Sequence, residues 1–170
     1  MPGSCIIGKE EISNWFDKQG SIKTIIDVGC GSGTYRKLLK KDYYWVGVEI
    51  WVPYIELFNL DSLYNEIIIA DIAYFDFSYL LNRFKKEETC VILGDVIEHL
   101  DKADGLRVLN NVLNETGHFV LSLPVDGRDS EIHYGNLFES HKSKWAFKEV
   151  VSLCRWEKTI ESRGMGIFIK

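Results

Sequence analysis

Runs of apolar residues alternate along the chain with segments in which apolar and polar residues share a helical period. Runs rich in β-branched residues predict buried strands, and apolar residues recurring every three or four positions predict amphipathic helices. The predicted strands cover residues 24–28, 43–50, 66–70, 89–93 and 118–123, followed by a closing pair at 156–160 and 165–169. Helices are predicted at 9–19, after 34, from Pro53, at 76–84, through 106–113 and around 145–153. This alternation is typical of an α/β protein.

A glycine-rich loop follows the first predicted strand. Gly29, Gly31 and Gly33 occupy alternate positions after the run 24–28, and a helix pattern begins at once. Without a Cβ, the backbone can turn tightly and let a ligand lie against its amides, and the helix start presents free N–H groups. Strand, glycine loop and helix open many nucleotide-binding sheets, although a dinucleotide fingerprint would place its last glycine at Thr34. The alternative is a tight turn that binds nothing.

Acidic residues stand at the ends of several predicted strands. Glu49 closes the second strand, about 20 residues after the first glycine, where a carboxylate can accept hydrogen bonds from both hydroxyls of a ribose. Asp71 closes the third strand, and Asp95 follows the fourth. The alternatives are a solvated glutamate at a strand end and an aspartate that only forms a turn. Because parallel strands end at one edge of a sheet, we expect these acids to lie near one crevice.

Two segments carry a family resemblance. The G-x-G-x-G loop preceded by Asp27 resembles motif I of the class I S-adenosylmethionine (SAM)-dependent methyltransferases. The run Gly94-Asp95-Val96-Ile97-Glu98-His99-Leu100 is similar to the acid and "-hhEHL-" run that many of them carry after strand four. Residues 139–145 resemble the E-x-H-x-S-x-W segment of some bacterial small-substrate methyltransferases. The resemblance covers most of the chain.

The resemblance implies a fold and a cofactor. The fold is α/β, with a doubly wound, mostly parallel seven-stranded sheet and a C-terminal antiparallel hairpin, in a single domain over 1–170 whose leading helix is at about 9–19. The cofactor is SAM, with S-adenosylhomocysteine (SAH) as product. Glu49 would bind the ribose, Asp71 and Ile72 the adenine, and Asp27 and Asp95 would stand near the methionine. The full set of implied cofactor-binding residues is Asp27, Gly29, Cys30, Gly31, Gly33, Glu49, Ile50, Trp51, Asp71, Ile72, Gly94 and Asp95. For Trp51, the alternative to a contact with the adenine is packing in the hydrophobic core.

Three residues are candidates for moving a proton during catalysis. His99 follows strand four, and His133 and Tyr134 lie in the irregular stretch 125–140 after strand five. A loop this long in a compact domain is usually functional or mobile, so it is expected to shape the acceptor pocket. Packing and hydrogen-bonding roles are the alternatives for all three residues.

Net charge, apolar runs and cysteine spacing argue against several other classes of protein. The net charge of -5 argues against broad electrostatic capture of nucleic acid or anionic membrane. No apolar run approaches the ~18 residues of a membrane span, and the four cysteines form no C-x-x-C pair. These features predict a cytoplasmic, reduced protein. No sequence spacing typical of metal ligands appears, so no metal site is expected.

The leading functional hypothesis is methyl transfer from SAM to a small-molecule acceptor. The alternative is a non-catalytic, methyltransferase-like subunit that binds SAM, or nothing, and regulates a partner. The chain leaves few residues for a separate substrate domain, so a homodimer that completes the acceptor site is one candidate assembly.

Overall fold

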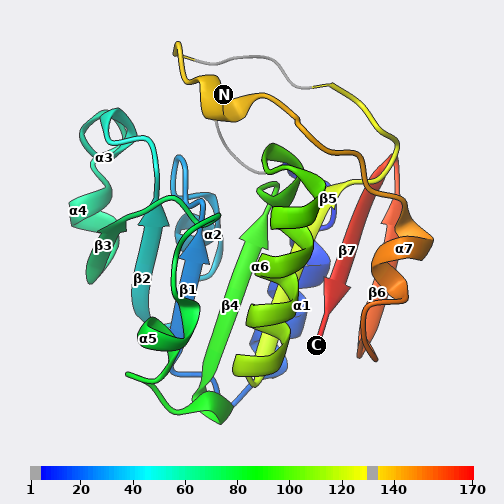
Figure 1. Cartoon of the computed structure of the whole chain (residues 1–170). Coiled ribbons are helices and arrows are strands. Elements are labelled where there is room, and N and C mark those ends of the chain that lie inside the picture. The colour runs from blue at the N-terminus through cyan, green and yellow to red at the C-terminus, as the bar shows by residue number, and fades with distance from the viewer. Residues whose placement is uncertain (1–4, 130–133) are drawn as a thin grey trace.

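The strands of the computed structural model, which describes residues 5–129 and 134–170, form one seven-stranded sheet (Figure 1). Their order across the sheet is β3-β2-β1-β4-β5-β7-β6. The strands β1 to β5 pair in parallel, and β7 runs antiparallel to both β5 and β6. The bounds are β1 Thr24–Val28, β2 Tyr44–Glu49, β3 Glu66–Ile69, β4 Thr89–Gly94, β5 His118–Pro124, β6 Lys158–Ser162 and β7 Met165–Ile169.

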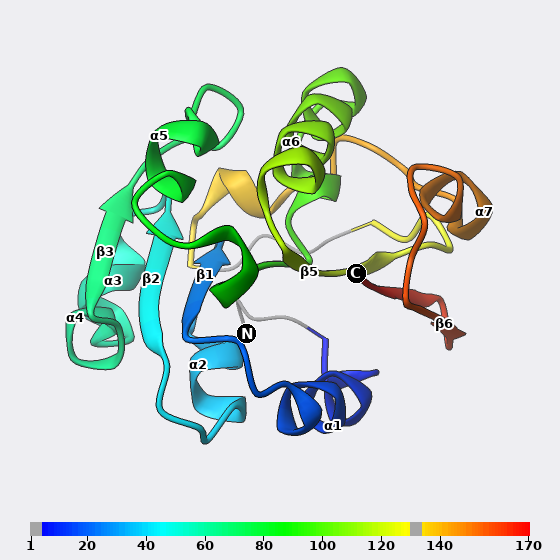
Figure 2. The same ribbon diagram turned by 90° about the horizontal axis from the view of Figure 1, so that it is seen from below.

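Helices cover both faces of this sheet, as the view from below shows (Figure 2). On one face lie α5 (Phe77–Leu81), α6 (Lys102–Glu115) and α7 (Phe147–Val151). On the other lie α1 (Lys9–Lys18) and α2 (Thr34–Leu38), with α3 (Pro53–Leu57) and α4 (Leu60–Leu63) toward the β3 edge. The predicted doubly wound, mostly parallel sheet with its antiparallel C-terminal hairpin is confirmed.

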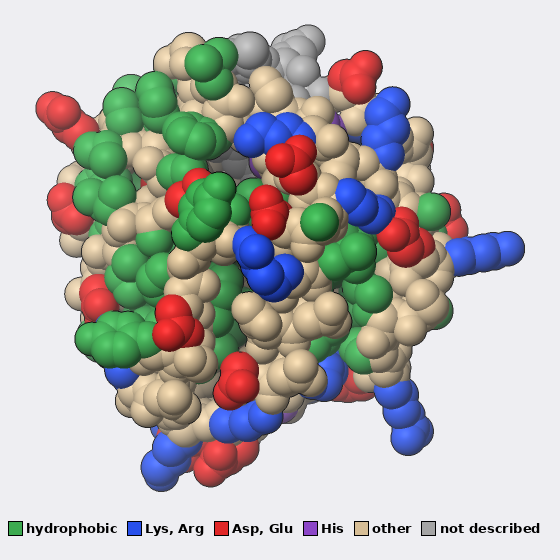
Figure 3. Space-filling model, in the orientation of Figure 1, with side chains coloured by type: hydrophobic (Ala, Val, Ile, Leu, Met, Phe, Trp, Pro, Cys, Tyr) green, Lys and Arg blue, Asp and Glu red, His purple; other side chains and the backbone are tan. Residues whose placement is uncertain are grey.

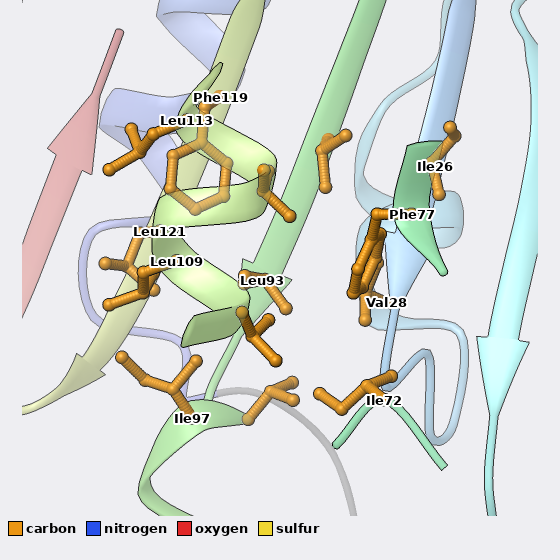
Figure 4. Packing of buried hydrophobic residues seen from close by; sticks show 14 of the residues in the cluster. Ile26, Val28, Ile72, Phe77, Leu93, Ile97, Leu109, Leu113, Phe119 and Leu121 are labelled. Carbon is orange, nitrogen blue, oxygen red and sulfur yellow. The ribbon is translucent and has the colours of Figure 1, made fainter. Parts of the chain in front are cut away.

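Side chains of the central strands alternate between two hydrophobic cores. On β1, Ile26 and Val28 point into the core beneath α5 and α6, whereas Ile25 belongs to the core beneath α1 and α2. The close-up view shows Ile26 and Val28 beside Phe77 and Leu93, with Leu109 of α6 further along the same layer (Figure 4). Because both faces are covered, these strands are apolar at almost every position, as expected for a parallel sheet.

One predicted helix is interrupted in the structure. Asn59 adopts a left-handed backbone conformation, with φ 52°, and separates α3 from α4. The sequence pattern predicts that Tyr54, Leu57 and Phe58 form one buried side. Tyr54 is buried, but the prediction is wrong for Leu57, whose side chain is 52% exposed. A five-residue helix presents little more than one turn, so helical periodicity is a weak guide to its buried face.

Candidate functional site

A deep cavity opens at the carboxyl ends of the parallel strands. It has a volume of about 430 Å³ and is lined by residues that follow β1, β2, β3, β4 and β5. The strand order reverses between β1 and β4, and this is the place where open α/β sheets bind ligands. The surface in Figure 3 is hollowed beside the loop that follows β4.

The glycine loop forms one wall of this cavity. Gly29, Gly31 and Gly33 have φ of 65°, 50° and 73°, a region that residues with a Cβ rarely adopt. A Cβ on Gly29 would also lie 2.6 Å from Cγ2 of Val96, in the loop after β4. The glycines therefore allow both the sharp turn after β1 and the close approach of the two loops.

Glu49 is held at the end of β2 with its carboxylate in the cavity wall. Its Oε2 accepts a hydrogen bond from the Gly31 N–H at 2.9 Å, and its Oε1 accepts one from the Trp51 N–H at 2.8 Å. The side chain is 5% exposed, and burial raises the pKa of Glu49 while these N–H donors oppose the shift. The carboxylate is thus fixed between the glycine loop and the chain after β2, with further lone pairs available to a ligand.

Asp27 lies beneath the loop in an almost fully buried position. Its Oδ2 accepts a hydrogen bond from the Tyr64 hydroxyl at 2.6 Å. Burial raises the pKa of Asp27 to about 7, against the opposing effects of Tyr64 and of the Lys9 ammonium. The group therefore titrates near neutral pH in the unliganded protein.

Lys9 is a buried cation that the sequence patterns do not reveal. Its ammonium lies 3.7 Å from the centre of the Tyr35 ring and donates a hydrogen bond to the Tyr35 hydroxyl. Burial lowers the pKa of Lys9 to about 8, while Asp95 and Asp27 raise it. A lysine in the first turn of an amphipathic helix ordinarily lies in solvent. Only the packing of α1 on the sheet brings Lys9 near two aspartates.

Asp95 is held by both its backbone and its side chain. It adopts a left-handed conformation with φ 58°, its N–H donates to the Ser122 carbonyl at 2.7 Å, and its Oδ2 accepts from the Cys5 N–H at 2.6 Å. Cys5 also lines the cavity. The segment before α1 therefore reaches the carboxyl end of β4.

A segment after β5 crosses to the opposite side of the cavity. It includes the short helix η3 (Leu137–Glu139), and the Tyr54 hydroxyl donates to Glu139 Oε1 at 3.0 Å. The Phe138 ring lies 6.2 Å from the ring of Trp51. These contacts tie the chain after β5 to the chain after β2. The described residues 134–146 run along the top of Figure 1.

Comparison with known proteins identifies the architecture. No protein-family model and no curated protein sequence matches the chain. Solved structures match over nearly its whole length. The PH0226 protein from Pyrococcus horikoshii matches with a TM-score of 0.68 and 16% identity, over 95% of this chain and 86% of that one. A glycopeptide N-methyltransferase, MtfA, solved with SAM, matches with a TM-score of 0.63 and 14% identity, over 95% and 92%. DhpI, solved with SAH, matches with a TM-score of 0.67 and 13% identity, over 94% and 82%.

The chain has the class I methyltransferase fold.

A fold does not by itself specify a chemistry. A structure titled a putative Zn-dependent alcohol dehydrogenase, from Rhodobacter sphaeroides, also matches, with a TM-score of 0.68 and 10% identity over 94% of this chain and 88% of that one. Function must therefore be argued from the side chains around the cavity. Among the described residues, none of the helices has the length and apolar character needed to cross a membrane.

The methyltransferase fold brings most of the predicted cofactor residues to the cavity. Those that line it are Asp27, Gly29, Cys30, Gly31, Glu49, Ile50, Asp71, Ile72, Gly94 and Asp95. Asp71 also forms a turn, because its Oδ1 accepts from the Ala73 N–H at 2.9 Å. Gly33 and Trp51 are not among the lining residues. Gly33 precedes α2, and Trp51 offers its backbone N–H to Glu49 and its ring to Phe138.

The three candidate proton acceptors lie in different surroundings. His99 lines the cavity; burial, with a smaller contribution from His141, lowers the pKa of His99 to about 4. Tyr134 does not line it: the side chain is 61% exposed, and its ring lies near those of Tyr54 and Phe58. His133 lies outside the described residues.

Glu98 and His141 complete a group that was not expected from the sequence. Glu98 lines the cavity, and burial, with Asp95 and Glu139 nearby, holds the pKa of its carboxyl well above the ordinary value. The ligand atoms of Glu98, His99 and His141 all lie within 4.8 Å of one another. Both of the family-like segments after β4 and β5 contain members of this group, but only the fold shows that the segments meet.

Acidic side chains dominate the cavity lining. Arg128 and Lys142 are the only arginine or lysine residues among those that line it within the described chain. The acidic residues are Asp27, Glu49, Asp71, Asp95, Glu98, Asp101, Asp104, Asp129 and Glu139. This excess of carboxyl groups favours a ligand that carries positive charge.

Proposed function

We propose that this protein binds SAM in the cavity and transfers its methyl group to a small-molecule acceptor. The observation that carries the proposal is the position of Glu49. Its carboxylate is locked by the Gly31 and Trp51 N–H groups at the edge of a glycine-lined cavity at the switch point of the sheet. The ribose of an adenosyl group has a vicinal diol, and both of its hydroxyls can donate hydrogen bonds to such a carboxylate.

The remaining lining residues suit the other parts of SAM. Ile50 and Ile72 supply apolar contact for a flat base, and the Asp71 carboxylate supplies an acceptor for its amino group. Asp27 and Asp95 stand toward β1 and β4, where the α-ammonium group of the methionine moiety and the sulfonium would find acceptors. MtfA and DhpI, which share the fold, were crystallised with SAM and SAH respectively.

The sulfonium makes the methyl group electrophilic when SAM is bound, so the chain's tasks are positioning and exclusion of water. The segment that carries Asn136 and Glu139 is tied to Tyr54 and walls part of the cavity. The acceptor is proposed to enter between this segment and the loop after β4. His99, with its lowered pKa, is a neutral imidazole at pH 7 and is proposed to orient the acceptor by hydrogen bonding.

Calorimetric titration with SAM and with SAH tests cofactor binding directly. The native protein is expected to bind both at one site. Glu49→Gln should weaken SAM binding by roughly 10- to 100-fold, the equivalent of about 1.5–3 kcal/mol for hydrogen bonds to a charged group. The glutamine side chain would also place its NH₂ group against one of the two backbone N–H groups that donate to the Glu49 carboxylate, so one of these hydrogen bonds would be lost.

The matched control is Glu161→Gln, because Glu161 is an exposed glutamate on β6. Its SAM affinity should equal that of the native protein. If the native protein gives no heat with either ligand, the SAM assignment is wrong. If Glu49→Gln binds as tightly as the control, the ribose assignment is wrong even though SAM binds.

Methyl transfer is tested separately from cofactor binding. Incubation of the protein with SAM and a panel of small hydroxylated and amino compounds is expected to release SAH with at least one of them. Tight SAM binding with no SAH release from any compound would favour the alternative, a SAM-binding regulatory subunit.

A further inference from the structure

Three potential metal ligands meet at the cavity wall between the loop after β4 and the segment after β5. They are the Glu98 carboxylate and the imidazoles of His99 and His141, whose ligand atoms lie within 4.8 Å of one another. None of the three is needed for the proposed contacts with the adenosyl group, and in the metal-bound protein the ion would take the place of the direct hydrogen bond from His99 to the acceptor. We propose that Glu98, His99 and His141 bind a divalent transition-metal ion.

The Glu98 side chain is the strongest observation for this site. It is 1% exposed, and no hydrogen bond of normal geometry reaches Oε1 or Oε2 among the described residues, although the nearby backbone N–H groups of Glu98 and Val96 partly favour the charged form. A buried carboxyl without a partner is costly, so such groups in proteins are usually paired with a cation or coordinate a metal. A metal ion bound to Glu98 would supply the missing interaction.

Both imidazoles are oriented by backbone carbonyl groups. His141 Nδ1 lies 2.8 Å from the Arg128 carbonyl oxygen, and His99 Nδ1 lies 3.3 Å from that of Ser140. A carbonyl oxygen only accepts, so each Nδ1 must carry the proton in these contacts, and the lone pair of each ring is then on Nε2. Histidine ligands of metals are commonly oriented by this arrangement.

The two chain segments that carry the ligands are joined by their backbones. The Glu98 carbonyl oxygen accepts from the N–H groups of Lys142 at 2.8 Å and Ser143 at 3.0 Å. The Ser143 hydroxyl donates to the Ile97 carbonyl at 3.3 Å. His141 is therefore held beside Glu98 and His99 by bonds that do not involve the ligand atoms, so the site is largely formed before any ion binds.

The donor set indicates the class of metal. Two imidazoles and one carboxylate suit Zn²⁺, Co²⁺, Fe²⁺ or Mn²⁺, whereas Ca²⁺ and Mg²⁺ prefer oxygen ligands alone. Metal–ligand bonds of roughly 2.0–2.2 Å bring ligand atoms closer together than 4.8 Å, so the side chains would move toward the ion on binding. With three protein ligands, further positions on the metal face the cavity.

Cobalt absorption spectroscopy on protein freed of metal with a chelator tests the proposal. Titration with Co²⁺ is expected to saturate at one equivalent and to give d–d bands without the thiolate-to-cobalt charge-transfer band that a cysteine ligand would add. Glu98→Gln and His141→Ala should each weaken binding by more than the roughly 10- to 100-fold typical for loss of an outer-sphere partner. Zn²⁺ should displace Co²⁺ and raise the melting temperature of the native protein but not of either variant.

Two control variants test the assignment of the ligands. Glu161→Gln changes an exposed glutamate on β6, and His118→Gln changes a histidine at the start of β5. Both should retain one equivalent of Co²⁺ at native affinity. Failure of the native protein to bind stoichiometric Co²⁺ or Zn²⁺, or equal binding by Glu98→Gln, His141→Ala and the controls, would overturn the proposal. These measurements contain no SAM, so they stand apart from the test of cofactor binding.

Discussion

Glycine residues of this chain differ in what a side chain would cost. Gly29 has both a positive φ and a close neighbour, since an added Cβ would lie 2.6 Å from Val96 Cγ2. Gly135 has a φ of 73° but no atom within 4 Å of an added Cβ. Gly20 has neither constraint. A comparison of alanine substitutions at these three glycines therefore distinguishes the cost of a left-handed backbone from the cost of a steric clash in the glycine loop.

Alanine substitutions at these positions should give three levels of stability in urea unfolding. Gly20→Ala should be neutral or stabilising by up to about 0.5 kcal/mol, because it reduces the freedom of the unfolded chain. Gly135→Ala should cost about 1–2 kcal/mol from the left-handed backbone alone. Gly29→Ala should cost more than Gly135→Ala, and adding Val96→Ala should recover the part due to collision. Equal values for Gly29→Ala and Gly135→Ala would show that the Val96 contact is unimportant.

At the scale of elements, the chain after β4 and the chain before α7 act as one unit. Ser143 connects them: its hydroxyl donates to the Ile97 carbonyl and accepts from the Trp145 indole N–H at 2.9 Å. Trp145 in turn lies beneath the Lys102 ammonium, which is 3.5 Å from the ring centre. The position of His141 therefore depends on packing around the start of α6.

Ser143→Ala should destabilise the protein by about 1–3 kcal/mol, because the buried Trp145 N–H would lose its acceptor. Ser152→Ala is the matched control, since Ser152 is an exposed serine whose hydroxyl bonds only to the Glu149 carbonyl within the described structure. Its cost should be within about 0.5 kcal/mol of zero. Thermal and urea unfolding measure both, and equal costs would mean that the connection is not important for stability.

For the whole molecule, the acidic cavity links stability to pH. Asp27, Glu49 and Glu98 are all buried with raised pKa values, and that of Asp27 is about 7 against 3.8 for the ordinary group. At a pH between 3.8 and about 7, the unfolded chain has released the Asp27 proton while the folded protein still keeps it. The unfolded state then binds fewer protons, so the free energy of unfolding falls as the pH rises.

Without SAM, the contribution of Asp27 to stability should therefore decrease from about pH 4 to pH 7, while His99, whose pKa is lowered from 6.5 to about 4, acts in the opposite direction between those two values. Asp27 alone should contribute up to about 4 kcal/mol over its full range, at about 1.4 kcal/mol for each unit of pKa difference. Relative to the native protein, Asp27→Asn should gain stability as the pH rises and should exceed it at pH 8. Urea unfolding at several pH values measures this. Parallel curves for the two proteins would mean that the pKa of Asp27 is not raised.

The sequence by itself determined the strand and helix pattern, with its seven strand segments, and the strand-end acids, whereas their assembly into one sheet was implied by the family resemblance. These features are local, because apolar periodicity and glycine spacing are fixed by neighbours in the chain. The glycine loop, Glu49 and Asp95 were identified in this way and lie together at the cavity or beside it. Boundaries of short elements were less well determined, as Asn59 and Leu57 show, because one backbone conformation can end a helix that the pattern would continue.

Only the tertiary structure decided which distant side chains meet. Lys9 is far in sequence from Asp27 and Asp95, and His141 from Glu98, so no local pattern shows that these residues meet. Sheet pairing and the backbone bonds between the two loops bring them close together. Burial then shifts their charge equilibria, because desolvation depends on every element packed around a group and not on its neighbours along the chain.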